Sequence, residues 1–115
     1  MIDLTEYLGK EVNIVIDRPL GSAHPNHGDI IYPVNYGYIQ NTVSGDGEEI
    51  DVYLLGVSVP VRDSSCRIIA VIERLDDNEN KLVGAPVGVE FTKEEIAKLT
   101  NFQEQYFDIR IITEV

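Results

Sequence analysis

The chain has few basic residues and a single cysteine, and each shortage excludes a class of protein. It carries nine Lys and Arg against 20 Asp and Glu, which gives a formal net charge of −11. Nucleic-acid binding needs a basic surface, so we expect no nucleic-acid partner. Cys66 is the only cysteine, so no intrachain disulfide can form, and its strand-like apolar flanks predict a buried, inert thiol.

Long apolar runs are missing as well. No segment reaches the roughly 18 apolar residues that a membrane-spanning helix needs, and the first residues lack the basic and apolar regions of a signal peptide. We therefore expect a cytoplasmic protein with no membrane partner. The chain also lacks repeats, linkers and low-complexity tracts, and a length of 115 residues predicts one domain over 1–115.

Short alternating or apolar runs predict a mainly β fold. The expected strands are 11–17, 36–43, 50–57, 66–74, 81–85 and 108–115. In the third of these, Ile50, Val52 and Leu54 are expected to face the core, and Asp51 and Tyr53 the opposite side.

One helix is predicted to begin near Thr92, late in the chain. Thr92 is a good N-cap residue, and Glu95 three positions later completes a capping box. Short antiparallel strands joined by tight turns, such as the Asp46-Gly47 turn, favour a small barrel.

Acidic residues gather in two short segments. Four of the six residues in 46–51 and three of the four in 76–79 are Asp or Glu. Such clusters suit divalent cations, because Mg²⁺ and Ca²⁺ take oxygen ligands. Asp46 and Asp51 can converge on a cation, with Glu48 between them to accept a proton from a metal-activated water. The alternative is a solvated acidic hairpin tip, and residue types alone favour it.

Tyrosines and one lysine stand beside these acidic segments, and each has two readings. Tyr32, Tyr36 and Tyr38 are spaced as core or cross-strand aromatics, yet a phenol hydroxyl can also donate to a phosphate oxygen. Lys81 is either half of a weak surface ion pair or a cation that neutralises a transferring phosphoryl group.

Taken together, these segments resemble the signature of the soluble, single-domain inorganic pyrophosphatases. Residues 32–39 read Tyr-Pro-Val-Asn-Tyr-Gly-Tyr-Ile and are similar to the family's Tyr-Pro-x-Asn-Tyr-Gly-Phe/Tyr-Ile. Residues 46–51 are similar to its Asp-Gly-Asp-x-x-Asp, with Glu48 in place of the middle aspartate. Residues 76–86 resemble its Asp-x-x-x-x-Asp-x-Lys segment with two residues deleted. The resemblance implies an OB-like barrel, closed or partly open, with one C-terminal helix.

The resemblance also implies a role for each matching residue and Mg²⁺ as cofactor, with Mn²⁺ as a substitute. The implied metal ligands are Asp46, Asp51, Asp76 and Glu79. The implied catalytic residues are Glu48, which activates the attacking water, with Tyr36, Lys81 and Arg18. The implied substrate-binding residues are Tyr32, Tyr106, Arg18 and Lys81.

Several positions depart from the family pattern. Phe107 stands where the family has a phosphate-binding lysine, and the lysine and glutamate of an early family hairpin have no clear counterpart. Arg18 matches either the family's Val-Asp-Arg or an earlier strand whose following hairpin is deleted; both alignments place it near the site. His24 and His27 are either exposed loop residues or extra metal or phosphate ligands.

The leading hypothesis is a shortened, Mg²⁺-dependent inorganic pyrophosphatase that hydrolyses pyrophosphate to two phosphates. The alternatives keep the fold and change the ligand: an enzyme for a larger phosphate-containing substrate, or a non-catalytic module that binds metal and a phosphate-containing ligand. The expected partner is pyrophosphate or another phosphate-containing small molecule, although the non-catalytic module could instead bind a partner protein, and assembly into a homo-oligomer stays open.

Overall fold

The computed structural model describes residues 3–43 and 47–114, and within them six strands and one α-helix. A short 3-10 helix, η1 (Leu4–Tyr7), comes first. The elements that follow are β1 (Glu11–Arg18), β2 (Asn35–Ile39), β3 (Ile50–Leu54), β4 (Asp63–Arg74), β5 (Lys81–Ala85), α1 (Lys93–Glu104) and β6 (Ile109–Ile112). This is the predicted class: mainly β with one C-terminal α-helix.

The predicted strands are all present, but their ends differ from the prediction. β2 ends at Ile39 instead of 43 because its last paired residue, Ile39, lies opposite Ile50. β3 ends at Leu54 instead of 57 because Leu54, opposite Asn35 and Gly84, is its last paired residue. β4 begins at Asp63 instead of 66, since Asp63 already pairs with β1. The predicted turn residue Asp46 lies outside the described residues.

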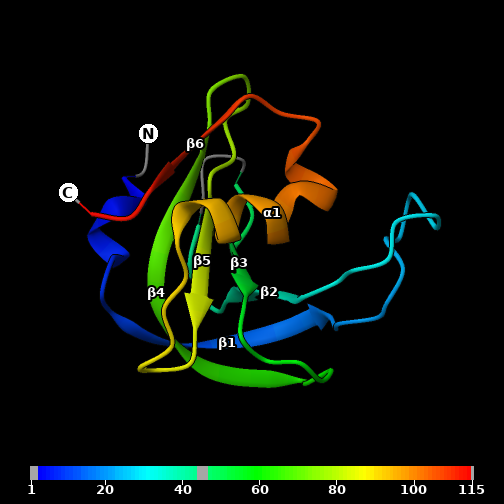
Figure 1. The fold of residues 1–115 in the computed structure, drawn as a ribbon, viewed down its shortest axis with the longest axis horizontal. Coiled ribbons are helices and arrows are strands. Elements are labelled where there is room, and N and C mark those ends of the chain that lie inside the picture. Colours follow the sequence, from blue (N-terminus) through cyan, green and yellow to red (C-terminus); the bar gives the residue numbers. More distant parts are fainter. Residues whose placement is uncertain (1–2, 44–46, 115) are drawn as a thin grey trace.

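Five of the strands close into a barrel (Figure 1). Their order is β1-β2-β3-β5-β4, β4 pairs back to β1, and β6 adds to the free part of β4. All pairs are antiparallel except β3 with β5, which is parallel. The sequence favoured short antiparallel strands, and the β3–β5 pair is the exception, because β5 inserts between β3 and β4 after the chain has returned along β4.

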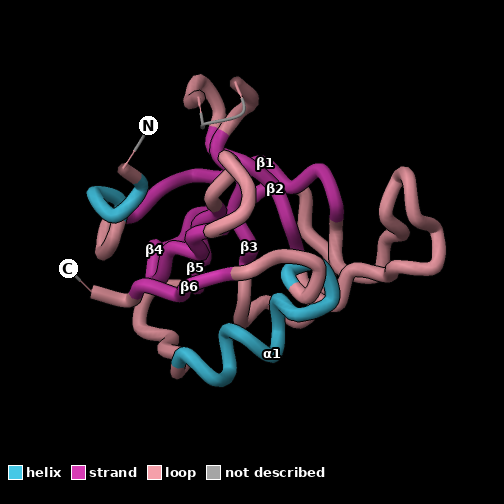
Figure 2. Tube along the Cα trace, turned by 90° about the horizontal axis from the view of Figure 1, so that it is seen from above, coloured by secondary structure: helices cyan, strands magenta, loops and turns pink. Residues whose placement is uncertain are grey.

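Alternation along the strands separates two hydrophobic clusters, one on each side of the sheet. The barrel interior holds the predicted core residues of β3, Ile50, Val52 and Leu54. Tyr53 faces the other way, as predicted, and is fully buried in a second cluster with Ile96 of α1. Figure 2 shows α1 running along this outer side of the strands.

Two β-bulges place basic side chains on the α1 side of the sheet, where regular alternation would have put them on the interior side. In β4, Cys66 and Ile68 belong to the interior cluster, but the register shifts between Ile68 and Ala70, so Ala70 joins the outer cluster. Arg74 follows Ala70 at even spacing and emerges on the same side. A bulge re-aims side chains in this way because two residues of one strand oppose a single residue of its partner.

The second bulge lies in β1, between Ile16 and Arg18. Ile16 is in the interior cluster, whereas the guanidinium of Arg18 lies 5.5 Å from the ring centre of Tyr36 in the outer cluster. Without the bulge, the period of two would have kept both side chains on one face.

The helix α1 begins as its sequence predicts. The Thr92 hydroxyl accepts a hydrogen bond from the Glu95 amide at 3.1 Å, and the Glu95 carboxylate accepts one from the Thr92 amide at 2.8 Å, which completes the capping box. Ile96, Thr100 and Glu104, each four residues apart, form its buried face.

Cys66 is buried in the barrel interior, and this burial raises the pKa of its thiol to about 11. The thiol is therefore protonated and poorly reactive at neutral pH, as its apolar flanks predicted. Among the described residues, no helix is both long and apolar enough to cross a membrane.

Gly37, the glycine of the Tyr-Gly-Tyr motif, is required by the close approach of β1. A Cβ at this position would lie 1.8 Å from the carbonyl oxygen of Val15. We expect Gly37→Ala to lower the free energy of unfolding by at least about 1–3 kcal/mol, the cost of overpacking. Gly28→Ala is the control, since a Cβ there meets nothing within 4 Å. Urea denaturation measures both, and equal stability of the two variants would contradict the close strand contact.

Candidate functional site

A cleft of about 1070 Å³ opens on the α1 side of the barrel, between the projecting segment that follows β1 and the end of α1. It is lined by Asp17, Arg18, His24, His27, Asp29, Ile30, Tyr36, Tyr38, Glu48, Glu49, Asp51, Arg74, Glu79, Lys81, Gln103, Tyr106 and Phe107. Most segments of the chain contribute to it, so the cleft is a product of the whole fold.

Strand register brings the central polar groups of the cleft together. Tyr38 is paired with Asp51 across β2 and β3, and Tyr36 with Tyr53. The parallel pairing of Val52 with Leu82 then sets Lys81, the residue before Leu82, beside Asp51. These side chains share the side of the sheet opposite the barrel interior.

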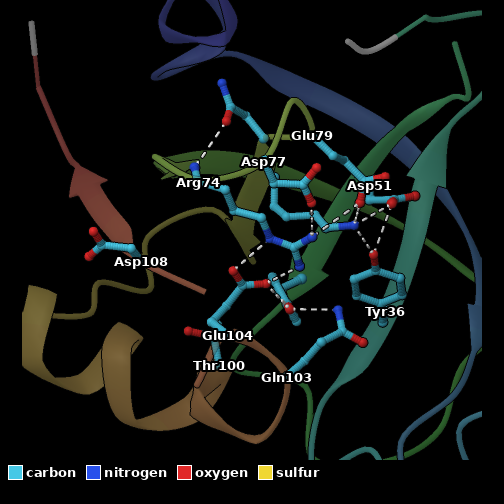
Figure 3. A network of polar contacts seen from close by, with 12 residues as sticks. Tyr36, Asp51, Arg74, Asp77, Glu79, Thr100, Gln103, Glu104 and Asp108 are labelled. Atoms are coloured by element: carbon cyan, nitrogen blue, oxygen red, sulfur yellow. Dashed lines mark hydrogen bonds and ion pairs between the residues drawn. The ribbon is translucent and has the colours of Figure 1, made fainter. Parts of the chain in front are cut away.

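Lys81 is the centre of a compact ionic cluster with Tyr36, Asp51 and Glu79, three residues that are labelled in Figure 3. Its Nζ donates to Asp51 Oδ2 and to the Tyr36 hydroxyl, both at 2.6 Å, and contacts Glu79 Oε1. Tyr36 also donates to Asp51 Oδ2 at 2.9 Å. Burial, and next the charge of Asp51, raise the pKa of Tyr36 well above its ordinary value, so this phenol remains a donor.

Arg18 occupies another part of the cleft wall. Its Nη1 donates to the Tyr32 hydroxyl at 2.6 Å, and that hydroxyl donates to Gln103 Oε1 at 2.9 Å. Gln103 Nε2 in turn donates to Tyr53, whose hydroxyl donates to Glu104. Burial raises the pKa of Tyr32 although Arg18 acts against it, so Tyr32 also stays protonated.

Arg74 and Glu104 form a buried ion pair that was not predicted from the sequence. Arg74 Nε donates to Glu104 Oε1 at 2.9 Å and Nη2 to Oε2 at 2.7 Å, and the two residues are 6% and 2% exposed. Burial by itself would lower the pKa of Arg74, but the hydrogen bonds and charge of Glu104 outweigh it and the pKa is raised. The sequence does hold one indication of this pair: Glu104 is a charged residue eight positions after Ile96, on the helix face that becomes buried.

The fold brings most of the predicted site residues to the cleft. Those that line it are Arg18, Tyr36, Glu48, Asp51, Glu79, Lys81 and Tyr106. Tyr106, beyond the end of α1, is 65% exposed. His24 and His27 also line the cleft, with their ring centres 5.1 Å apart.

Three of the predicted residues lie elsewhere or are not described. Tyr32 is fully buried and reaches the cleft only through Arg18. Asp76 does not line the cleft; its Oδ1 accepts a hydrogen bond from the amide of Asp108 at 3.1 Å, just before β6. Asp46 lies outside the described residues.

The match to known proteins now decides the family. A model of the family described as inorganic pyrophosphatase matches residues 5–111. The chain belongs to the inorganic pyrophosphatase family. An inorganic pyrophosphatase of Xylella fastidiosa (strain 9a5c) is 29% identical over 113 residues, which cover 80% of this chain and 63% of the relative. Another, from Mycoplasma pneumoniae, is 38% identical over 88 residues, which cover 69% of this chain and 42% of the relative. The chain thus spans about two to three fifths of the length of these curated relatives.

Solved structures of the same family share the fold. An inorganic pyrophosphatase from Neisseria gonorrhoeae superimposes with a TM-score of 0.67 at 24% identity, covering 85% of this chain and 74% of the other. One from Coxiella burnetii gives a TM-score of 0.66 at 17% identity, covering 97% and 89%. At these identities the likeness concerns the fold, and it confirms the predicted OB-like barrel.

The charges of the cleft suit a divalent cation better than a bare anion. Six carboxylates line it, from Asp17, Asp29, Glu48, Glu49, Asp51 and Glu79, against three basic side chains, from Arg18, Arg74 and Lys81. No group of three or more His, Cys, Asp or Glu side chains among the described residues is arranged to hold a metal ion. Mg²⁺ does not require one, because it commonly binds through one or two carboxylates, several waters and substrate phosphates. The hard oxygen donors of Asp51, Glu48 and Glu79 fit that mode.

The buried Arg74–Glu104 pair predicts strong non-additivity in stability. Arg74→Gln alone leaves the carboxylate of Glu104 buried without its cation, which typically costs about 3–5 kcal/mol. Replacing both ions by glutamine removes both charges, so we expect Arg74→Gln/Glu104→Gln to be more stable than Arg74→Gln. Urea denaturation of the two variants and of Glu104→Gln measures the coupling. Additive losses would show that the pair is not coupled.

Proposed function

We propose that the chain hydrolyses inorganic pyrophosphate to two phosphates and requires a divalent cation, Mg²⁺ or Mn²⁺. The observation that carries the proposal is the cluster around Lys81, in which an ammonium, a phenol and two carboxylates meet in the wall of an acidic cleft. Membership of the inorganic pyrophosphatase family supports the same substrate.

In the proposal, carboxylates hold the cation at the acidic wall of the cleft. Asp51, Glu79 and Glu48 line this wall, and Asp46 and Asp76 are further candidates from the sequence. Tyr36 and Lys81 both bind Asp51 through Oδ2, so the other carboxylate oxygen faces no competing donor among the described side chains. Bound Mg²⁺ would neutralise phosphate charge and lower the pKa of a bound water.

The remaining roles follow from charge and position. Glu48 accepts the proton of the attacking water. As the new oxygen–phosphorus bond forms, the bond to the bridging oxygen breaks, and the second phosphate leaves with that oxygen and its electron pair. Lys81 and Arg18 compensate the negative charge of the phosphoryl oxygens, and Tyr36 donates a hydrogen bond to them, because phosphoryl transfer depends on positioning and charge stabilisation. Tyr106 contacts substrate from the rim, and Tyr32 positions Arg18.

A larger phosphate-containing ligand is the second candidate, either as a substrate or bound without turnover. The size of the cleft favours it, since about 1070 Å³ lies at the upper end of the range of roughly 300–1,000 Å³ typical of sites for drug-sized ligands, and pyrophosphate is much smaller than such a ligand. Phe107, in place of the family's lysine, also removes a cation that would hold pyrophosphate.

Several broader expectations belong to the same proposal. The chain acts as one domain over 1–115 in the cytoplasm, and its partner is pyrophosphate or another phosphate-containing small molecule, with assembly into a homo-oligomer left to direct measurement.

The role of Glu48 can be tested by phosphate release. With pyrophosphate and Mg²⁺ at neutral pH, we expect the wild type to release phosphate and Glu48→Gln to lose about 10²–10⁴-fold in turnover, as for a missing general base. Glu90→Gln carries the same charge change at an exposed position outside the cleft and should retain full turnover. A colorimetric phosphate assay measures all three. If the wild type releases phosphate only from a larger phosphoanhydride, the second candidate replaces the first.

Metal binding by Asp51 can be tested without turnover. Like-charged carboxylates repel one another, so millimolar Mg²⁺ or Mn²⁺ should raise the melting temperature of the wild type. Asp51→Asn should reduce this rise, whereas Glu90→Gln should leave it unchanged. Differential scanning fluorimetry with and without metal measures the shifts. The same rise in Asp51→Asn and wild type would remove Asp51 from the ligand set.

A further inference from the structure

Arg74 brings a third cation to the cleft from a position outside the motifs that the sequence shares with its family. It is the last residue of β4, which the bulge between Ile68 and Ala70 turns toward α1. Its side chain lines the cleft although the residue is only 6% exposed. Burying a charge is costly unless the charge is paired, so the partners of this guanidinium determine how it is held at the border of the cleft.

The guanidinium is fixed along one edge and on one face. Glu104 binds Nε and Nη2 through both carboxylate oxygens, and the ring centre of Phe107 lies 3.7 Å from the guanidinium carbon. A bidentate pair combined with stacking on a ring leaves the planar group little freedom to turn.

The remaining nitrogen, Nη1, faces the acidic side of the cleft. It lies 3.3 Å from Asp77 Oδ2 and 3.6 Å from Glu79 Oε1, longer than either contact with Glu104. Figure 3 shows the guanidinium between Glu104 on one side and Asp77 and Glu79 on the other, and Glu79 also contacts Lys81. Nη1 therefore points toward the Lys81 cluster, which carries the proposed chemistry.

Phe107 relates the position of Arg74 to the family pattern. The family resemblance expects a phosphate-binding lysine at this position, and here the position carries a ring that packs on Arg74. The ring at this position thus lies directly against a guanidinium from β4. A guanidinium suits this role, because it carries five N–H donors, so Nη1 can donate to a phosphate oxygen while Nε and Nη2 stay bound to Glu104.

We infer that Arg74 is a substrate-binding residue whose Nη1 donates a hydrogen bond to a phosphate oxygen. It would replace the lysine that the family has at the position of Phe107. Glu104 and Phe107 are its positioning residues. The inference rests on the proposed function. When Glu79 binds the metal in that proposal, one of the two carboxylates that face Nη1 is engaged elsewhere, and a phosphate oxygen takes its place.

The test compares binding of methylenediphosphonate, a pyrophosphate analogue that cannot be hydrolysed, by titration calorimetry in Mg²⁺. We expect Arg74→Gln/Glu104→Gln to bind the analogue about tenfold to a hundredfold more weakly than wild type, because it lacks one charge-assisted hydrogen bond. The double variant avoids an unpaired buried charge and leaves the net charge unchanged. Arg110→Gln/Glu73→Gln is the matched control, since this pair at 2.6 Å is exposed and outside the cleft.

A rescue variant separates a substrate contact from a structural role. Adding Phe107→Lys to the double variant returns an ammonium to the family's position and should recover at least tenfold in affinity. Unchanged binding by the double variant, an equal loss in the control, or a loss that Phe107→Lys does not recover would each overturn the inference. Phosphate release from pyrophosphate by the wild type is measured separately, so tight binding without turnover would reject the proposed function and leave the inference intact. A wild type that does not bind the analogue would overturn the inference, and one that also releases no phosphate would reject the proposed function as well.

Discussion

The parallel pairing of β3 with β5 is the contact on which the rest of this structure depends. It joins the β2–β3 hairpin to the β4–β5 hairpin and so closes the barrel around its apolar interior. The same register sets Lys81 beside Asp51 and packs Tyr53 next to Val83, under α1. A shift of one residue would turn every side chain of β5 to the other face. Barrel closure and the polar cluster of the cleft are therefore fixed by one set of hydrogen bonds.

The cations of the cleft are all tied to acceptors, and this governs what the cleft can bind. Lys81 is bound by two carboxylates, Arg74 by Glu104 and two weaker carboxylate contacts, and Arg18 by the hydroxyl of Tyr32. An anion entering this cleft meets more negative than positive charge. Divalent cations would reverse that balance, which is why the acidic lining and a phosphate-containing substrate are compatible.

The helix α1 connects the two sides of the cleft through its last turn. Gln103 binds the hydroxyls of Tyr32 and Tyr53, and Glu104 binds Tyr53 and Arg74. Arg18 and Arg74 are thus the two ends of one chain of hydrogen bonds that runs through neighbouring helix residues. Such buried chains are rigid when every member is satisfied, and no buried side-chain polar atom among the described residues lacks a partner. Two cations of the cleft are thus positioned by a single element.

Local pattern was sufficient for much of the fold, for the helix start and for the position of the site. The alternation in β3 and the capping box at Thr92 act between near neighbours, and the tyrosine and acidic motifs lie close in sequence, so their placement could be predicted. The parallel β3–β5 pair, the two bulges and the Arg74–Glu104 pair depend on contacts between distant segments. Strict alternation would have left Arg74 on the side of Cys66 and Ile68, and only the register against β5 moves it across the sheet. The sequence by itself determined the tyrosine and acidic motifs of the candidate site, the approximate positions of the strands and the start of the helix. Tertiary structure decided which cations reach the cleft, because a bulge is a property of two paired strands and not of either one.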